Sequence, residues 1–92
     1  MKKTDADYKR TDVTYGQLDK VLRSLGFACR HVKGDPPTSV YEHKESGARI
    51  TLPRFPDRDR VLDYHLIAVR TILDGFGIAD PHSLAAELQT AG

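Results

Sequence analysis

The chain contains no tryptophan, a single cysteine and no long apolar run. Cys29 alone cannot form an internal disulfide or a zinc site built from several cysteines, and such low cysteine usage is typical of a reducing compartment, so we expect a cytoplasmic protein. No apolar stretch approaches the roughly 20 residues that a membrane-spanning helix requires. Residues 1–10 are charged with no apolar stretch behind them, so we expect no secretory signal.

A strong net charge is also lacking. The formal charge is +1 at pH 7, whereas proteins that bind nucleic acids without sequence preference are usually far more basic. Most basic side chains precede residue 61, and residues 61–92 contain Arg70 as their only Lys or Arg. Any contact with phosphate must therefore come from a local patch of the first 60 residues rather than from the overall field.

The apolar pattern predicts a helix at each end of one domain. Thr14 and Gln17 have the spacing of a capping box, the leucines and valine from Leu18 to Leu25 recur on one helical face, and Gly26 provides a left-handed stop. A second apolar stripe runs from Leu62 to Phe76 at helical spacing. Asp80-Pro81 begins a short third helix as N-cap and first helical residue.

Between the first two helices lie three predicted strands, at residues 27–32, 38–43 and 48–52. Their connections are too short for a crossover, so we expect an antiparallel meander. Because the sheet has one apolar face, both main helices should cover the same side of it. The expected fold class is α+β: a three-stranded antiparallel sheet with two helices on one face plus a short C-terminal helix.

The domain boundaries follow from composition and length. Residues 1–12 are polar and lack periodicity, so we expect a flexible tail. Ninety-two residues are enough for one domain only, which we place at residues 13–92. Within it, residues 54–60 alternate in charge and are predicted to be a loop.

Several segments occur in an order that is familiar from one family. They are the helix ending Leu25-Gly26-Phe27, the hairpin from Tyr41 to Pro53 with Gly47 in its turn, the helix over residues 66–73 and its Gly77-Ile78 ending. Over about residues 14–78 the chain resembles the HicA toxin family. The resemblance implies a dsRBD-like (double-stranded-RNA-binding-like) α-β-β-β-α fold and an mRNA interferase, an RNA endonuclease and thus a hydrolase, working in a toxin–antitoxin pair.

The chain departs from the family at one important position. Family members usually have Gly-Ser-His at the start of the second strand, where the histidine is regarded as catalytic. Aligned on Tyr41, that histidine falls near Thr38, and residues 34–39 contain no histidine. We therefore expect a HicA-like RNA-binding domain with impaired catalysis, in which the histidine is lost or relocated.

Four histidines are available as a base, because His is the side chain whose ordinary pKa suits proton transfer near pH 7. His43 is the leading catalytic candidate, since it would face the open side of the sheet beside Arg49 if the hairpin pairs symmetrically about Ser46. A one-residue slip would turn it to the other face. His31, His65 and His82 are weaker candidates, and no two histidines have the i, i+3 or i, i+4 spacing of a helical metal site. We expect no metal and no cofactor.

A basic set and one aromatic residue are the candidates for RNA contact: Arg30, Lys33, Lys44, Arg49, Arg54, Arg58, Arg60 and Tyr41. The alternative is a solvated surface in which neighbouring aspartates form weak local ion pairs. RNA is thus one expected partner. A small antitoxin-like protein is another, because a protein-interaction module could use the open sheet face or a strand edge without any catalysis. The sequence leaves the oligomeric state open.

Overall fold

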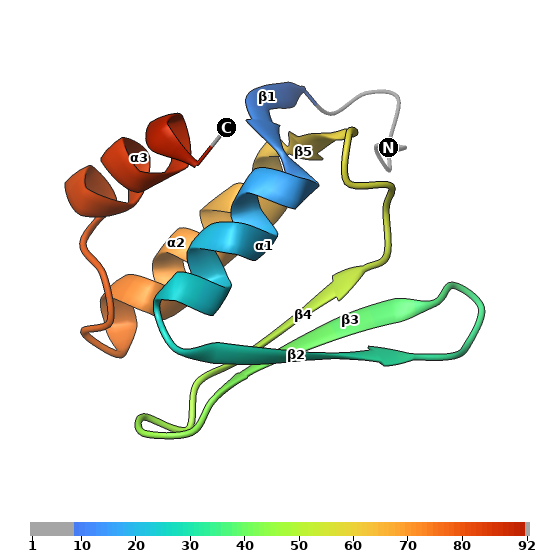
Figure 1. The fold of residues 1–92 in the computed structure, drawn as a ribbon, viewed down its shortest axis with the longest axis horizontal. Helices are drawn as coiled ribbons and strands as arrows, with labels where there is room; N and C mark the ends of the chain where they lie inside the picture. The colour runs from blue at the N-terminus through green and yellow to red at the C-terminus, as the bar shows by residue number, and fades with distance from the viewer. Residues whose placement is uncertain (1–8, 92) are drawn as a thin grey trace, which may run out of the picture.

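In the computed structural model, which describes residues 9–91, five strands and three helices follow one another along the chain (Figure 1). In order, they are β1 (Arg10–Thr14), α1 (Tyr15–Ser24), β2 (Phe27–Val32), β3 (Thr38–His43), β4 (Arg49–Pro53), β5 (Arg60–Leu62), α2 (Asp63–Gly75) and α3 (Pro81–Thr90). This is the expected α+β class, with a three-stranded antiparallel sheet and three helices.

The main sheet has the strand order β2-β3-β4, and both pairs are antiparallel, which confirms the predicted meander. Both α1 and α2 lie on one side of it in Figure 1. Alternate strand residues face that side: Phe27, Tyr41 and Ile50 belong to the buried core shared with the helices. Within residues 9–91, no helix lies over the opposite face of the sheet (Figure 1), so the described helices cover one face.

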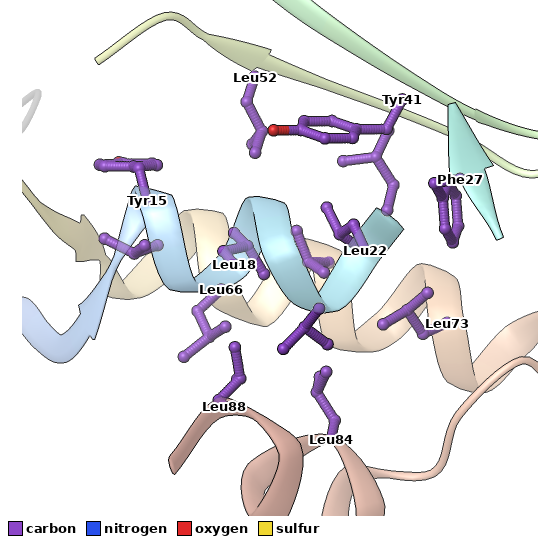
Figure 2. Close-up of a cluster of buried hydrophobic side chains, with 14 of the residues drawn as sticks. Tyr15, Leu18, Leu22, Phe27, Tyr41, Leu52, Leu66, Leu73, Leu84 and Leu88 are labelled. Carbon is purple, nitrogen blue, oxygen red and sulfur yellow. The ribbon is translucent and has the colours of Figure 1, made fainter. Parts of the chain in front are cut away.

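The helical layer is packed from both sides. Leu18, Leu22 and Leu73 are almost fully buried between the helices and the sheet, while Leu84 and Leu88 of α3 fill the side away from the sheet (Figure 2). Phe76 does not join the predicted stripe, because it lies at the C-cap of α2 and is half exposed. Among the described helices, none is long and apolar enough to cross a bilayer.

Helix α1 begins and ends as predicted. The Thr14 hydroxyl accepts from the Gln17 amide N–H at 3.1 Å, and the Thr14 N–H donates to the Gln17 side chain at 2.8 Å, so the capping box is complete. Two of the N–H groups at the helix start thereby gain partners. After the helix, Gly26 has φ of 100°, a left-handed conformation that side chains other than glycine rarely adopt.

The predicted tail and loop boundaries are wrong. Residues 10–12 belong to β1, and Arg60 belongs to β5, with which β1 pairs antiparallel in a second, two-stranded sheet. The Thr11 hydroxyl adds a hydrogen bond to the Val61 carbonyl at 3.0 Å. This pairing joins segments 50 residues apart in sequence, and neither shows strand periodicity on its own. The rest of the expected tail, residues 1–8, lies outside the described residues.

The β3–β4 hairpin differs by one residue from the symmetric arrangement about Ser46. Glu42 pairs with Arg49, and the His43 N–H donates to the Ala48 carbonyl at 2.9 Å. The connection therefore contains four residues, 44–47, and ends at Gly47 with φ of 79°. A glycine in this left-handed conformation fixes the register of the hairpin. The slip places His43 and Arg49 on opposite faces of the sheet.

Candidate nucleic-acid interface

The basic residues predicted to contact RNA do not form one patch. Arg30 and Arg49 lie on the open face of the main sheet, and Lys33 and Lys44 lie in the turns at its opposite ends. Arg54 and Arg58 belong to the connection between β4 and β5, and Arg60 starts β5 beside Asp12 of β1, 4.0 Å away. The open face and the region around Arg54 are therefore separate candidate surfaces.

On the open face, two arginines share one carboxylate. Arg30 donates through Nε to Oε1 of Glu42, and Arg49 donates through Nη2 to Oε2, each at 3.0 Å. These hydrogen bonds, that of Arg30 first, lower the pKa of Glu42 below its ordinary value. We call Arg30, Glu42 and Arg49 the arginine row, which crosses all three strands.

The arginine row fixes the positions of two guanidinium groups on the open face but contributes little to the stability of the fold. All three side chains are substantially exposed, and exposed ion pairs contribute little free energy. A guanidinium has five N–H donors, so each arginine keeps donors that Glu42 does not use. Two arginines against one glutamate also leave the row with a net charge of +1. The row can therefore hold a phosphate group without losing its internal hydrogen bonds.

His43, the leading catalytic candidate, faces the helices and not the open side. Its Nε2 lies 3.1 Å from the Leu25 carbonyl, and its Nδ1 lies 2.8 Å from the Ser46 hydroxyl and accepts from the Ser46 N–H at 3.3 Å. Only the neutral tautomer protonated on Nε2 satisfies both ends, because a carbonyl accepts and an N–H donates. The ring also packs on Phe27, with centroids 5.0 Å apart. With both nitrogens engaged, His43 ties the end of α1 to the hairpin.

The other histidines are dispersed. His65 is buried on α2, where its Nδ1 lies 2.8 Å from the Tyr15 hydroxyl, which in turn accepts from the Leu62 N–H. His82 is exposed in the first turn of α3. His31 is exposed on β2, on the side of the sheet that faces the helices, opposite Ser39 of β3. No described histidine is thus placed beside another as an acid–base pair.

His31 lies at a cleft of about 190 Å³ between α1 and the end of the main sheet, which we call the α1 cleft. Four elements and a loop contribute to its lining, whose polar members include Asp19, Arg23, His31, Ser39, Tyr41, Arg54 and Asp57. The loop is held at both sides: the Arg54 N–H donates to the Pro37 carbonyl, and the Gly16 N–H of α1 donates to the Asp57 carbonyl, each at 2.9 Å.

One wall of the α1 cleft is an internal hydrogen-bond network. The Tyr41 hydroxyl donates to Oδ1 of Asp19 at 2.7 Å, and Arg23 donates to Oδ2 at 3.0 Å. Burial, followed by this bond to Asp19, raises the pKa of Tyr41, and the bond to Asp19 raises the pKa of Arg23. The Tyr41 ring is buried against α1 (Figure 2). The buried ring is not placed to stack on a base, so Tyr41 could contact RNA only through the hydroxyl that lies at the cleft.

The cleft residues Asp19, Arg23 and Ser39 were not among the sequence candidates. The i, i+4 spacing of Asp19 and Arg23 indicates only an ordinary helical ion pair. Ser39 precedes Tyr41 by two residues, which places both on the same face of β3. This spacing is the one feature of the sequence that could have indicated Ser39 as a neighbour of the candidate Tyr41. Cys29 is half-buried on the same face, opposite Tyr41. Among residues 9–91, no three His, Cys, Asp or Glu side chains gather as a metal ion would require.

Comparison of the chain with known protein families, with curated proteins and with solved structures found no match. The basis for a function is therefore the geometry of the arginine row and the α1 cleft, together with the sequence resemblance described above.

Proposed function

We propose that the chain is a HicA-like RNA-binding domain with a dsRBD-like fold, which holds the RNA backbone on the open face of its main sheet. The observation that carries this proposal is the arginine row. Arg30 and Arg49 are fixed at either side of Glu42 by two 3.0 Å hydrogen bonds and present their remaining donors to solvent. Guanidinium groups bind phosphate oxygens through paired N–H donors.

The order of elements supports the same proposal. Apart from the short β5, which pairs with β1 outside the main sheet, the chain from α1 to α2 follows the order α-β-β-β-α, with the helices on one side of the main sheet (Figure 1). The segments that resemble HicA form the end of α1, the β3–β4 hairpin and the middle of α2. The open face also carries the hydroxyls of Thr38 and Thr51 near the row, and such groups commonly contact phosphate and sugar.

Cleavage by His43 is not part of the proposal. A general base must accept a proton from its substrate, but both ring nitrogens of His43 are engaged with Leu25 and Ser46 inside the fold. Near Thr38, where the family has its histidine, the chain has none. We therefore propose a domain that binds RNA and does not use His43 to cleave it. It would act as one member of a toxin–antitoxin pair.

The test measures RNA affinity by fluorescence anisotropy over a series of salt concentrations, for wild type and for the double variant Arg30→Ala/Arg49→Ala. Each phosphate contact contributes a slope of about −0.7 to log K against log salt for single strands. Losing two contacts should therefore flatten the slope by about 1.4 and weaken binding at low salt. Arg70→Ala on α2 removes one positive charge away from the sheet; it is the control for each single variant, Arg30→Ala and Arg49→Ala, and should leave the slope nearly unchanged.

A further variant changes the net charge of the arginine row. Glu42→Gln removes the negative charge between the arginines, so RNA affinity at low salt should rise, whereas a row with a purely structural role gives unchanged or weaker binding. Absence of RNA binding by the wild type at low salt would contradict the proposal outright.

A protein partner is the second candidate function. Among the described strands, neither β2 nor β4 has a neighbour on its outer edge, and Val32 at the end of β2 is 39% exposed. A free edge can accept an extended segment of another chain as an additional strand, as a small antitoxin-like protein could supply. Co-expression with the product of a neighbouring reading frame tests it. A complex that survives high salt and does not form with Val32→Pro would favour this function over RNA binding.

A further inference from the structure

We infer that the α1 cleft binds one unpaired nucleobase of single-stranded RNA. This inference rests on the proposed RNA-binding function and adds the kind of RNA and the place where a base is read. It is carried by three observations: a hydroxyl that opens into the cleft, a balanced set of charges, and the position of the cleft at the edge strand β2.

Ser39 provides the first observation. Its side chain lines the cleft although the residue as a whole is only 8% exposed, and its hydroxyl is not among the buried side-chain atoms that lack a partner within residues 9–91, so it is open to the cleft. A serine hydroxyl can both donate and accept hydrogen bonds, so an open Ser39 hydroxyl can pair with either kind of group on a ligand. Ser39 lies between His31 and Leu52 on the helix-facing side, so a ligand in the cleft can reach its hydroxyl.

The charges in the cleft favour a neutral ligand. Asp19 and Asp57 balance Arg23 and Arg54, and the Asp19 carboxylate is already bound by Arg23 and Tyr41. A site for phosphate would be expected to carry a net positive charge. The α1 cleft instead offers donors and acceptors side by side, which matches the edge of a nucleobase, where N–H and carbonyl groups alternate.

The size and the walls of the cleft agree with one base. Its volume of about 190 Å³ is below the ~300–1,000 Å³ of pockets for drug-sized ligands. Leu52, Tyr15 and Phe55 supply apolar and aromatic walls, and the Tyr15 and Phe55 rings are stacked at 4.8 Å, which stiffens one side. A single planar ring system fits such a space, whereas a longer ligand would extend out of it.

The edge strand β2 joins the cleft to the arginine row. Arg30 and His31 are consecutive, so their side chains point to opposite faces of the sheet. An RNA strand that crosses the β2 edge can place a phosphate on Arg30 and turn the next base toward His31 and Ser39. Bases stacked within a duplex cannot turn out in this way without unpairing, so the geometry selects single-stranded RNA.

The test titrates ¹⁵N-labelled protein with four uncharged nucleosides and, separately, with inorganic phosphate. Nucleosides should shift the amide signals of Ser39 and Arg54, whereas phosphate should shift those of Arg30 and Arg49 and leave Ser39 and Arg54 unmoved. In parallel, Ser39→Ala should weaken binding of a single-stranded oligonucleotide roughly three- to tenfold, the loss of one or so hydrogen bond, with little effect on a duplex. Thr71→Ala on the exposed side of α2 is the matched hydroxyl control.

The outcomes separate this inference from the proposed function. If Ser39→Ala binds single-stranded RNA as wild type does, while the double arginine variant is weakened, the base site is wrong and the RNA-binding function stands. Shifts of Ser39 and Arg54 that phosphate produces and nucleosides do not also overturn the base site. If the wild type binds no RNA, the proposed function fails, and the nucleoside titration still decides what the cleft accepts.

Discussion

The assignment of a structural role to His43 makes a quantitative prediction. In His43→Ala, the Leu25 carbonyl at the end of α1 and the Ser46 hydroxyl and N–H in the hairpin lose their partner, and Phe27 loses the ring packed at 5.0 Å. Each hydrogen bond contributes roughly 0.5–1.5 kcal/mol to folding. Because the two contacts of Ser46 share Nδ1, we count them as one bond beside that to Leu25, and the free energy of unfolding should fall by about 2 kcal/mol.

The assay is thermal and urea denaturation beside RNA-binding measurements. For a domain of this size, 1 kcal/mol corresponds to a shift in Tm of roughly 4–8 °C, so His43→Ala should melt roughly 8–16 °C lower. His43→Gln, whose side-chain amide can donate to the Leu25 carbonyl, should recover part of the loss. His82→Ala, at an exposed histidine, is the control and should melt like wild type.

RNA affinity measured well below the melting point should be unchanged in His43→Ala, since the ring faces away from the arginine row. The reasoning is refuted if His43→Ala keeps the stability of wild type and loses an RNA-dependent activity. That result would make His43 a functional residue that is free to move out of its hydrogen bonds.

Three further predictions concern folding. Thr14→Ala removes the side-chain cap of α1 and should lower the free energy of unfolding by about 1 kcal/mol in urea denaturation; no change would mean that the helix start is held by other contacts. Gly26→Ala requires φ of 100° and brings the new Cβ to 3.3 Å from His43 Nε2, so it should destabilise by more than ~1 kcal/mol, whereas Gly75→Ala, with open space around it, should not. The pKa of Glu42 is lowered in the folded state, so its stabilising contribution is present above its ordinary pKa of 4.5 and is lost as pH falls through the folded value. Glu42→Gln should therefore show a flatter loss of stability below pH 4.5, and an acid limb identical to that of wild type would contradict it.

Local patterns predicted the elements whose signals are contained within a few residues. The capping box at Thr14, the stop at Gly26 and the strand pairs around Gly47 depend on neighbours in sequence, so they could be recognised before the structure was known. The pairing of β1 with β5 joins residues far apart in sequence, Arg10 with Leu62 and Thr14 with Arg60. Short segments of mixed polarity such as residues 10–14 become strands only because a partner is available, and no local signal reports that partner.

The candidate site shows the same limit. The basic residues were identified, but their division among the arginine row, the turns and the α1 cleft depends on strand register. Consecutive strand residues face opposite sides of the sheet, so a shift of one residue in the hairpin register decides whether His43 or Glu42 lies on the same face as Arg49. The α1 cleft combines residues of α1, the three strands of the main sheet and the following loop, and such a combination cannot be read from spacing along the chain.

The most direct measurement of the central claim is an amide chemical-shift titration of the ¹⁵N-labelled chain with a short single-stranded RNA. The account predicts that the largest changes occur at Arg30, Glu42 and Arg49 on the open face of the main sheet. Changes confined to α2 and α3, with the signals of β2–β4 unmoved at saturating RNA, would contradict it.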